Sequence, residues 1–218
     1  MTTYPVGVGP GAGPEALAGL LAEAPRTDEL DTRILDAALA QFETYGLRRV
    51  SVEDVAKGAR VARTTIYRRF TNKDQLVQAV ILRECRRFLT AIAEAIEGLP
   101  TPEDALVEGF VVGLRNARGH PLLTRVLAAE PEAFLPQLSM NGGAVMLAAR
   151  DILAERLRRA RPEAGEDFTV ASEILVRVAL SLLLVPGGGL AVEDDEEVRV
   201  FARDHLTRVL RPAEPDGT

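Results

Sequence analysis

Cysteine, tryptophan and histidine are scarce in this chain of 218 residues, which has one cysteine, no tryptophan and two histidines. The single Cys85 excludes an internal disulfide framework and a zinc site built from several cysteines. Two histidines, His120 and His205, are too few for a histidine-rich metal or catalytic centre. We therefore expect no metal and no cofactor.

Long apolar runs are also missing. No segment reaches the ~20 uninterrupted apolar residues of a membrane-spanning helix. The N-terminus has no basic region followed by an apolar stretch, so we expect no signal peptide. These absences predict a cytoplasmic protein without a membrane partner. With 47% apolar and 27% charged residues, the composition is that of an ordinary globular protein.

Charge is distributed unevenly along the chain, whose net charge is -6. The window 46–73 holds eight basic and two acidic residues, so it carries +6 while the rest of the chain carries -12. The eight basic residues are Arg48, Arg49, Lys57, Arg60, Arg63, Arg68, Arg69 and Lys73. A short basic segment in an acidic chain indicates one surface that binds a polyanion.

Apolar residues recur at helical spacing from residue 27 onward, and no strand pattern of useful length is present. The fold class is therefore predicted to be all-α. Residues 1–14 contain seven glycines or prolines and predict a loosely attached arm, followed by a possible short helix at 15–24. The expected helices run from Thr27 or Asp28 to Gly46, from Ser51 to Ala59, over 62–69, from Asn72 to about Gly98, and over 102–117, 121–129, 140–160, 166–185 and 193–210, with a looser segment at 131–138.

Two short helices with a tight turn between them, within residues 51–70, have the spacing of a helix-turn-helix. When Ile66 of the second helix is set facing inward at 100° per residue, Phe70 also faces inward. The outward face then carries hydroxyl and guanidinium groups, which suit a DNA groove and its phosphates. The candidate DNA-binding residues are Ser51, Arg63, Thr64, Thr65, Tyr67, Arg68 and Lys73.

Plain structural roles compete with these assignments. Ser51, three residues before Asp54, equally fits a helix cap with capping-box spacing. A basic helix face is often only solvated, and Tyr67 would also fit a core position with a wet hydroxyl. Arg69 lies half inward on the same helix, where it would pair with an acid of the domain instead of touching DNA.

The positions that carry the strongest pattern span residues 42–73. They are Phe42, Gly46, Val50, Ser51, Ala56, Ile66, Tyr67, Phe70 and Lys73. This pattern resembles the DNA-binding domain of the TetR family of transcriptional regulators. One position departs from it: the family often has glycine at the turn where this sequence has Arg60. If that position needs a positive φ, arginine is strained there unless a contact such as a phosphate compensates.

The resemblance implies an N-terminal three-helix helix-turn-helix domain joined by a long helix to a larger C-terminal helical domain for ligand binding and dimerisation. The corresponding divisions are an arm at 1–25, the DNA-binding domain at 26–75, the effector-binding and dimerisation domain at 76–212 and a tail at 213–218. A homodimer would form through the last two long helices. Its candidate interface residues are Ile174, Leu175, Val178, Leu182, Val198, Phe201 and His205.

The resemblance also implies a small-molecule pocket among the middle helices. The candidate lining residues are Phe88, Phe110, Leu114, Asn116, Phe134, Met146 and Arg177, with Ile92, His120, Leu138 and Met140 as further possibilities. Aromatic and methionine residues at helical spacing are equally typical of a plain core. Arg177 follows Glu173 by four residues, which fits an ion pair along the helix as well as a group facing a pocket or the dimer axis.

Three functions remain open from the sequence. The first is a dimeric repressor that binds a palindromic operator in double-stranded DNA and is released by a small lipophilic effector. The second is an activator or constitutive regulator without an effector pocket. The third, an enzyme, has little support, because no nucleophile–base set or metal spacing is visible and the acids at Glu193–Glu197 fit a helix start. We expect a regulator and not an enzyme.

Overall fold

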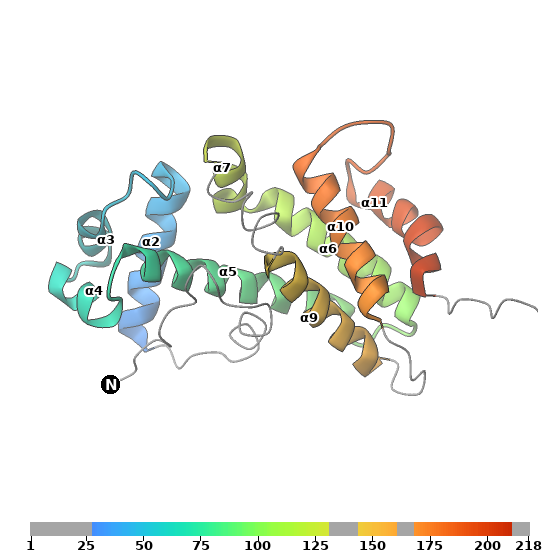
Figure 1. Ribbon diagram of the computed structural model, residues 1–218, viewed down its shortest axis with the longest axis horizontal. Coiled ribbons are helices and arrows are strands. Elements are labelled where there is room, and N and C mark those ends of the chain that lie inside the picture. The colour runs from blue at the N-terminus through green and yellow to red at the C-terminus, as the bar shows by residue number, and fades with distance from the viewer. Residues whose placement is uncertain (1–27, 131–143, 161–167, 211–218) are drawn as a thin grey trace, which may run out of the picture. The chain divides into compact units, whose positions relative to one another are not determined.

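The computed structural model describes residues 28–130, 144–160 and 168–210, and within these ranges the secondary structure is helical without strands (Figure 1). The described residues divide into two compact units. The first contains residues 28–87 and 120–130 together with Ala144, and the second contains 88–119, 145–160 and 168–210. The predicted all-α class is confirmed. Within the same ranges, no helix is long and apolar enough to cross a membrane.

The first unit is a small helical domain. It comprises α2 (Glu29–Tyr45), α3 (Val52–Ala59), α4 (Arg63–Arg69), the first part of α5 (Lys73–Ile96) and α7 (Pro121–Ala129). Its core is apolar and closed, and its largest fully buried side chains are Phe42, Phe70, Ile34, Leu35, Ile66, Leu76, Val55 and Val80. Asp28 caps α2 by accepting a hydrogen bond from the backbone N–H of Asp31 at 2.8 Å.

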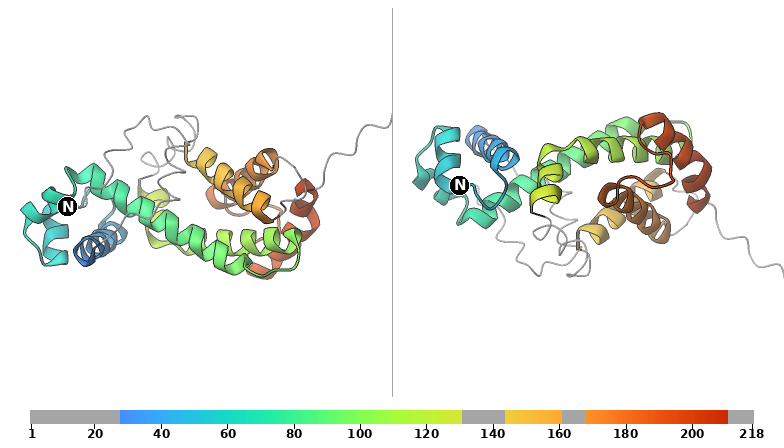
Figure 2. Two further views of the ribbon diagram at one scale, coloured as in Figure 1. Left: turned by 90° about the horizontal axis from the view of Figure 1, so that it is seen from below. Right: turned by 90° about the horizontal axis from the view of Figure 1, so that it is seen from above.

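The second unit is built around α6 (Pro102–Gly119). The last part of α5 runs alongside α6 (Figure 2), and Gly109 of α6 allows a close approach, because a Cβ at this position would lie 3.3 Å from a side-chain carbon of Ile96. On its other sides α6 contacts α10 (Thr169–Leu184), α11 (Asp195–Phe201), a π-helical turn (Ala202–Leu206) and a 3-10 turn (Thr207–Leu210). Ala154 and Leu157 of α9 (Ala144–Ala160) complete this core.

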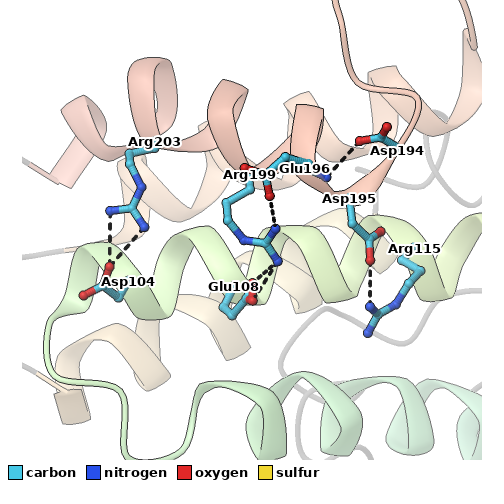
Figure 3. A network of polar contacts seen from close by, with 8 residues as sticks. All are labelled: Asp104, Glu108, Arg115, Asp194, Asp195, Glu196, Arg199 and Arg203. Atoms are coloured by element: carbon cyan, nitrogen blue, oxygen red, sulfur yellow. Dashed lines mark hydrogen bonds and ion pairs between the residues drawn. The ribbon is translucent and has the colours of Figure 1, made fainter.

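A ladder of three ion pairs joins α6 to the C-terminal helices (Figure 3). Asp104 pairs with Arg203 at 3.2 Å, Glu108 with Arg199 at 3.0 Å, and Arg115 with Asp195 at 2.8 Å. The α6 positions ascend while their partners descend, so the two segments run antiparallel. Exposed pairs of this kind contribute about 0–1 kcal/mol each, so the ladder specifies register more than it adds stability.

The expected helices are found within the described ranges, with differences in where they end and how they pack. The predicted helix at 193–210 is α11 followed by the π and 3-10 turns, and its buried residues Val198, Ala202, Leu206 and Leu210 are spaced by four. A spacing of four exceeds the 3.6 residues of an α-turn, and the wider π-turn keeps the side chains on the core.

The helix expected at 102–117 is α6, which extends to Gly119. The helix expected at 121–129 is α7, and its residues Leu122 and Val126 pack into the core of the first unit. The expectations for residues 1–25, 131–138, 140–143 and 213–218 lie outside the described residues.

Candidate nucleic-acid interface

Ser51 begins the helix-turn-helix as the cap of α3. Its hydroxyl accepts the backbone N–H of Asp54 at 3.2 Å, and the Asp54 carboxylate accepts the Ser51 backbone N–H at 3.0 Å. The Ser51 hydroxyl also donates to this carboxylate at 2.6 Å. These hydrogen bonds hold the pKa of Asp54 below its usual value. The capping box is therefore confirmed, whereas a phosphate contact of Ser51 stays a prediction.

Arg60 forms the turn between α3 and α4 in a left-handed conformation, with φ 56° and ψ 47°. Its N–H donates to the carbonyl of Lys57 at 3.2 Å, and the N–H of Val61 donates to that of Ala56 at 3.0 Å. This pair of hydrogen bonds is the Schellman ending, which usually has glycine at the left-handed position. An L-residue with a Cβ costs roughly 1–2 kcal/mol there. The departure from the family pattern, arginine in place of glycine, therefore puts a strained residue in this turn.

The exposed face of α4 is the one expected from the helical spacing. Ile66 and Phe70 are buried, whereas Thr64, Tyr67 and Arg68 are exposed and Thr65 is half-buried. Tyr67 is 40% exposed, so it is not a core residue.

Arg63 and Tyr67 form a pair on this face. A guanidinium N–H of Arg63 donates to the Tyr67 hydroxyl at 3.1 Å, and the guanidinium carbon lies 5.2 Å from the ring centroid. Because the hydroxyl oxygen accepts this hydrogen bond, its own proton remains available to an outside acceptor. This contact therefore positions the Arg63 guanidinium and the Tyr67 hydroxyl on the outer face of α4.

Arg69 faces the protein and not the solvent. Its guanidinium donates to both carboxylate oxygens of Asp31 at 3.0 Å and pairs with Asp28 at 2.7 Å. The alternative in which Arg69 pairs with an acid of its own domain is confirmed. Asp31 is fully buried, and this burial raises its pKa against the opposing attraction of Arg69.

Lys73 lies in the first turn of α5, where Asn72 accepts the backbone N–H of Gln75 at 2.9 Å. The Lys73 ammonium donates to the backbone carbonyl of Arg48 at 3.0 Å. This contact ties the start of α5 to the segment between α2 and α3. Contact of Lys73 with DNA stays a prediction.

Glu130 is a residue of this unit that sequence reasoning missed. Its carboxylate, at the end of α7, is buried and lies 3.4 Å from the backbone N–H of Arg48. A Cβ on Gly46, which has φ 84°, would come within 2.2 Å of one carboxylate oxygen. Glu130 is 84 residues from Gly46 in the chain, and no local pattern could have indicated this contact.

Comparison with known proteins identifies this architecture. Residues 34–80 match the pattern of bacterial regulatory proteins of the tetR family. Residues 102–210 match that of the bacterial tetracyclin repressor C-terminal domain. The chain belongs to the TetR family. It is a transcriptional regulator with a DNA-binding helix-turn-helix, formed here by α3 and α4.

Relatives within the TetR family are similar over most of the chain. The uncharacterised HTH-type transcriptional regulator Rv1255c of Mycobacterium tuberculosis H37Rv is 28% identical over 190 residues, 86% of this chain and 89% of the relative. UidR of Escherichia coli K12 is 27% identical over 172 residues, 79% and 87% of the two chains. The crystal structure of the TetR family repressor AlkX from Dietzia sp. strain DQ12-45-1b aligns with a TM-score of 0.61 and 26% identity, covering 85% of this chain and 99% of AlkX.

The pocket candidates of this TetR-family chain are found in different surroundings. Phe110 and Leu114 are buried in the core of the second unit, and Phe88, Asn116 and Met146 are half-buried. His120 caps α7 in the first unit, where its ring nitrogen accepts the Leu123 N–H at 3.4 Å. The expectations for Phe134, Leu138 and Met140 lie outside the described residues.

Arg177 occupies the surface of α10. Its side chain is 60% exposed and pairs with Glu173 at 2.7 Å. The ion pair expected from the spacing of four residues is confirmed. Arg177 therefore lies outside the core of the second unit, which contains Phe110 and Leu114.

The dimer candidates separate into two groups. Leu175, Leu182 and Val198 are buried in the core of their own unit, so they present almost no surface to a partner. Their contact with a second copy therefore stays a prediction, which their burial within one chain does not support. The remaining candidates are only partly covered: Val178 and Phe201 are half-buried, Ile174 is 40% exposed, and the exposed His205 ring lies 5.3 Å from that of Phe201.

Proposed function

We propose that this TetR-family protein is a dimeric, ligand-responsive repressor that binds a palindromic operator with α4 in the major groove. The observation that carries the proposal is the exposed face of α4, which is polar, basic and pre-arranged by the contact between Arg63 and Tyr67. Arginine suits guanine edges, threonine suits bases or phosphates, and the free tyrosine proton suits a phosphate. Thr64, Thr65 and Arg68 complete the proposed reading surface, with Ser51 and Lys73 at the proposed phosphate contacts.

A second copy of the chain is the proposed partner of the second unit. Exposed apolar side chains lie on α10 at Val170 and Ile174 and directly after its end at Val185, and they are 69%, 40% and 67% exposed. On α11, Val200 is 51% exposed. Exposed apolar side chains in this number support a surface that another protein covers. A two-fold dimer would present two α4 helices to half-sites about one turn of DNA apart.

Release by a small lipophilic effector is the regulatory part of the proposal. The proposed lining is mainly apolar: Phe88, Phe110, Leu114 and Met146 belong to the second unit, and Asn116 would add an amide. AlkX, a repressor implicated in biodegradation of n-alkanes, supports repression as the mode of action. An effector that prefers a state with a different spacing of the two α4 helices would lower operator affinity by shifting the population. The competing candidate, a constitutive regulator or activator, would keep operator binding without this response.

Selection of bound duplexes from a random DNA pool tests the proposal. The full-length protein is incubated with the pool at ~150 mM salt, which suppresses non-specific phosphate binding. A palindromic motif with half-sites about one helical turn apart is the expected product. Arg68→Ala should abolish or alter the motif, whereas Arg159→Ala, a change of an exposed arginine on α9, should leave it intact. If the dimeric wild-type protein enriches no sequence after unfolding and refolding to remove bound ligand, the proposed function is wrong.

A further inference from the structure

Arg60 is the one described residue other than glycine that has a positive φ. Glycine at this Schellman position would remove the steric strain while both backbone hydrogen bonds remained. A strained residue that the backbone does not require points to a role for its side chain.

Within the described ranges, the Arg60 side chain has no compensating contact. It is exposed and forms no ion pair there. Three of the neighbouring basic groups differ in this respect. Lys57 pairs with Glu53 at 3.0 Å, Arg69 pairs with Asp28 and Asp31, and Lys73 donates to a backbone carbonyl. Arg60 therefore adds a full positive charge to the surface beside the start of α4.

The place of Arg60 in the motif indicates what this charge meets. In a helix-turn-helix the first residues of the second helix reach base edges, and the first helix crosses the DNA backbone. Arg60 lies between the two, three residues before Arg63, with which α4 begins. A guanidinium at this place adjoins the phosphates that flank the bases read by α4, and arginine binds phosphate with two parallel hydrogen bonds.

We propose that Arg60 binds a backbone phosphate of the operator and that this contact is the reason why arginine occupies a left-handed position. The inference rests on the proposed operator binding and adds a residue outside the recognition helix. The contact strengthens binding to all sequences alike and positions α4 in the groove, because phosphates carry no direct sequence information.

Four forms of the full-length protein test the proposal: wild type, Arg60→Gly, Arg60→Asn and Arg60→Lys. Glycine and asparagine both tolerate the left-handed conformation without a charge, and lysine retains charge and strain. Each form is titrated with a duplex carrying the selected palindrome and with a scrambled duplex, from ~50 to ~300 mM salt. Thermal unfolding of each form is measured in parallel. Arg159→Gln on α9, a change of an exposed arginine that lies outside the basic segment 46–73 and pairs with Glu155 at 2.9 Å, is the matched control.

The expected result separates folding from binding. Arg60→Gly and Arg60→Asn should unfold at the wild-type temperature or above it, yet bind both duplexes roughly tenfold or more weakly. The plot of log affinity against log salt should become shallower by about 0.9 for each lost phosphate contact, or about 2 for a dimer. Arg60→Lys should keep most of the slope, and Arg159→Gln should change little.

Two results would overturn the phosphate contact. One is wild-type affinity and salt slope in a stable Arg60→Gly protein. The other is a loss confined to the palindrome at unchanged slope, which would place Arg60 on a base edge. Absence of any palindrome with the wild-type protein is a separate failure, and it concerns the proposed function.

Discussion

Arg68 and Arg69 are neighbours on α4, and replacing each with methionine should have opposite effects. Methionine keeps much of the length and the helix propensity of arginine but removes the charge. Arg69→Met should destabilise the protein, because it leaves the fully buried carboxylate of Asp31 without the guanidinium nitrogen that donates to both of its oxygens. Arg68→Met should leave stability almost unchanged and weaken operator binding, because Arg68 is exposed on the proposed reading surface.

The size of the Arg69 effect follows from the geometry of the ion pair. Removing one member of a buried ion pair costs about 3–5 kcal/mol. Arg69 is 19% exposed at its side chain while Asp31 is 0% exposed, so we expect the lower end, about 3 kcal/mol. For a protein of this length, that corresponds to a fall of roughly 6–12 °C in the unfolding midpoint. Arg68→Met should change the free energy of unfolding by less than about 0.5 kcal/mol.

Urea unfolding followed by far-UV circular dichroism measures both variants, and a double variant isolates the pair. Asp31→Leu combined with Arg69→Met replaces two charges with apolar groups, so it should recover most of the lost stability. Binding of the selected duplex, measured below the unfolding transition, should then be weak for Arg68→Met and near normal for the double variant.

The pH dependence gives an independent check on Asp31. Burial raises its pKa, and removal of Arg69 takes away the attraction that opposes this rise. In Arg69→Met the folded state therefore holds the Asp31 proton at pH values where the unfolded chain, with a pKa near ~3.9, has lost it. Stability of the variant consequently falls as pH rises from ~4 through the raised pKa, and its deficit should be smaller at pH 5 than at pH 7. An Arg69→Met protein with the wild-type midpoint at pH 7, or one whose deficit grows at pH 5, would refute the reasoning.

Three further predictions concern the local structure. Gly46→Ala should cost about 2 kcal/mol, because it combines φ 84° with a contact of 2.2 Å to a carboxylate oxygen, whereas Gly58→Ala, whose Cβ would meet only one methyl carbon at 3.4 Å, should be neutral or stabilising by about 0.5 kcal/mol; urea unfolding compares the two. Ser51→Ala should cost about 1 kcal/mol of stability. Since the wild-type hydrogen bonds lower the pKa of Asp54, the contribution of its ionised carboxylate to the cap should persist above pH ~4 and disappear as pH falls through that lowered pKa, which acid titration followed by circular dichroism can detect. Burial raises the pKa of the Cys85 thiol to about 11, so alkylation at pH 8 should be slow in the native protein and fast in urea; equal rates in both would contradict a buried thiol.

Local interactions explain why much of the DNA-binding unit was predictable. The capping box at Ser51 involves residues three apart, and the faces of α4 follow from a fixed turn of 100° per residue. The family pattern raised a left-handed turn at Arg60 as an open question, and the turn is closed by hydrogen bonds that span three and five positions. Such features depend on side chains and backbone groups that are neighbours along the chain, so the sequence contains them directly.

Contacts between distant segments required the tertiary structure. Helical spacing showed that Arg69 lies half inward, but its partner Asp31 is 38 residues away. The residues of two other contacts, Glu130 with Gly46 and Arg199 with Glu108, are likewise more than 80 positions apart in the chain. Many acids and bases lie at suitable helical positions, and only the packing of the helices decides which of them meet.

Helical periodicity was enough to identify the all-helical class, the helix-turn-helix and the outward face of α4. Periodicity did not distinguish core from surface among the apolar residues of α10, where Leu175 and Leu182 are buried while Val170 and Ile174 are exposed. Periodicity identifies a core face only when the opposite face is polar. α10 is apolar on nearly every side, so the elements that pack against it determine which side is buried.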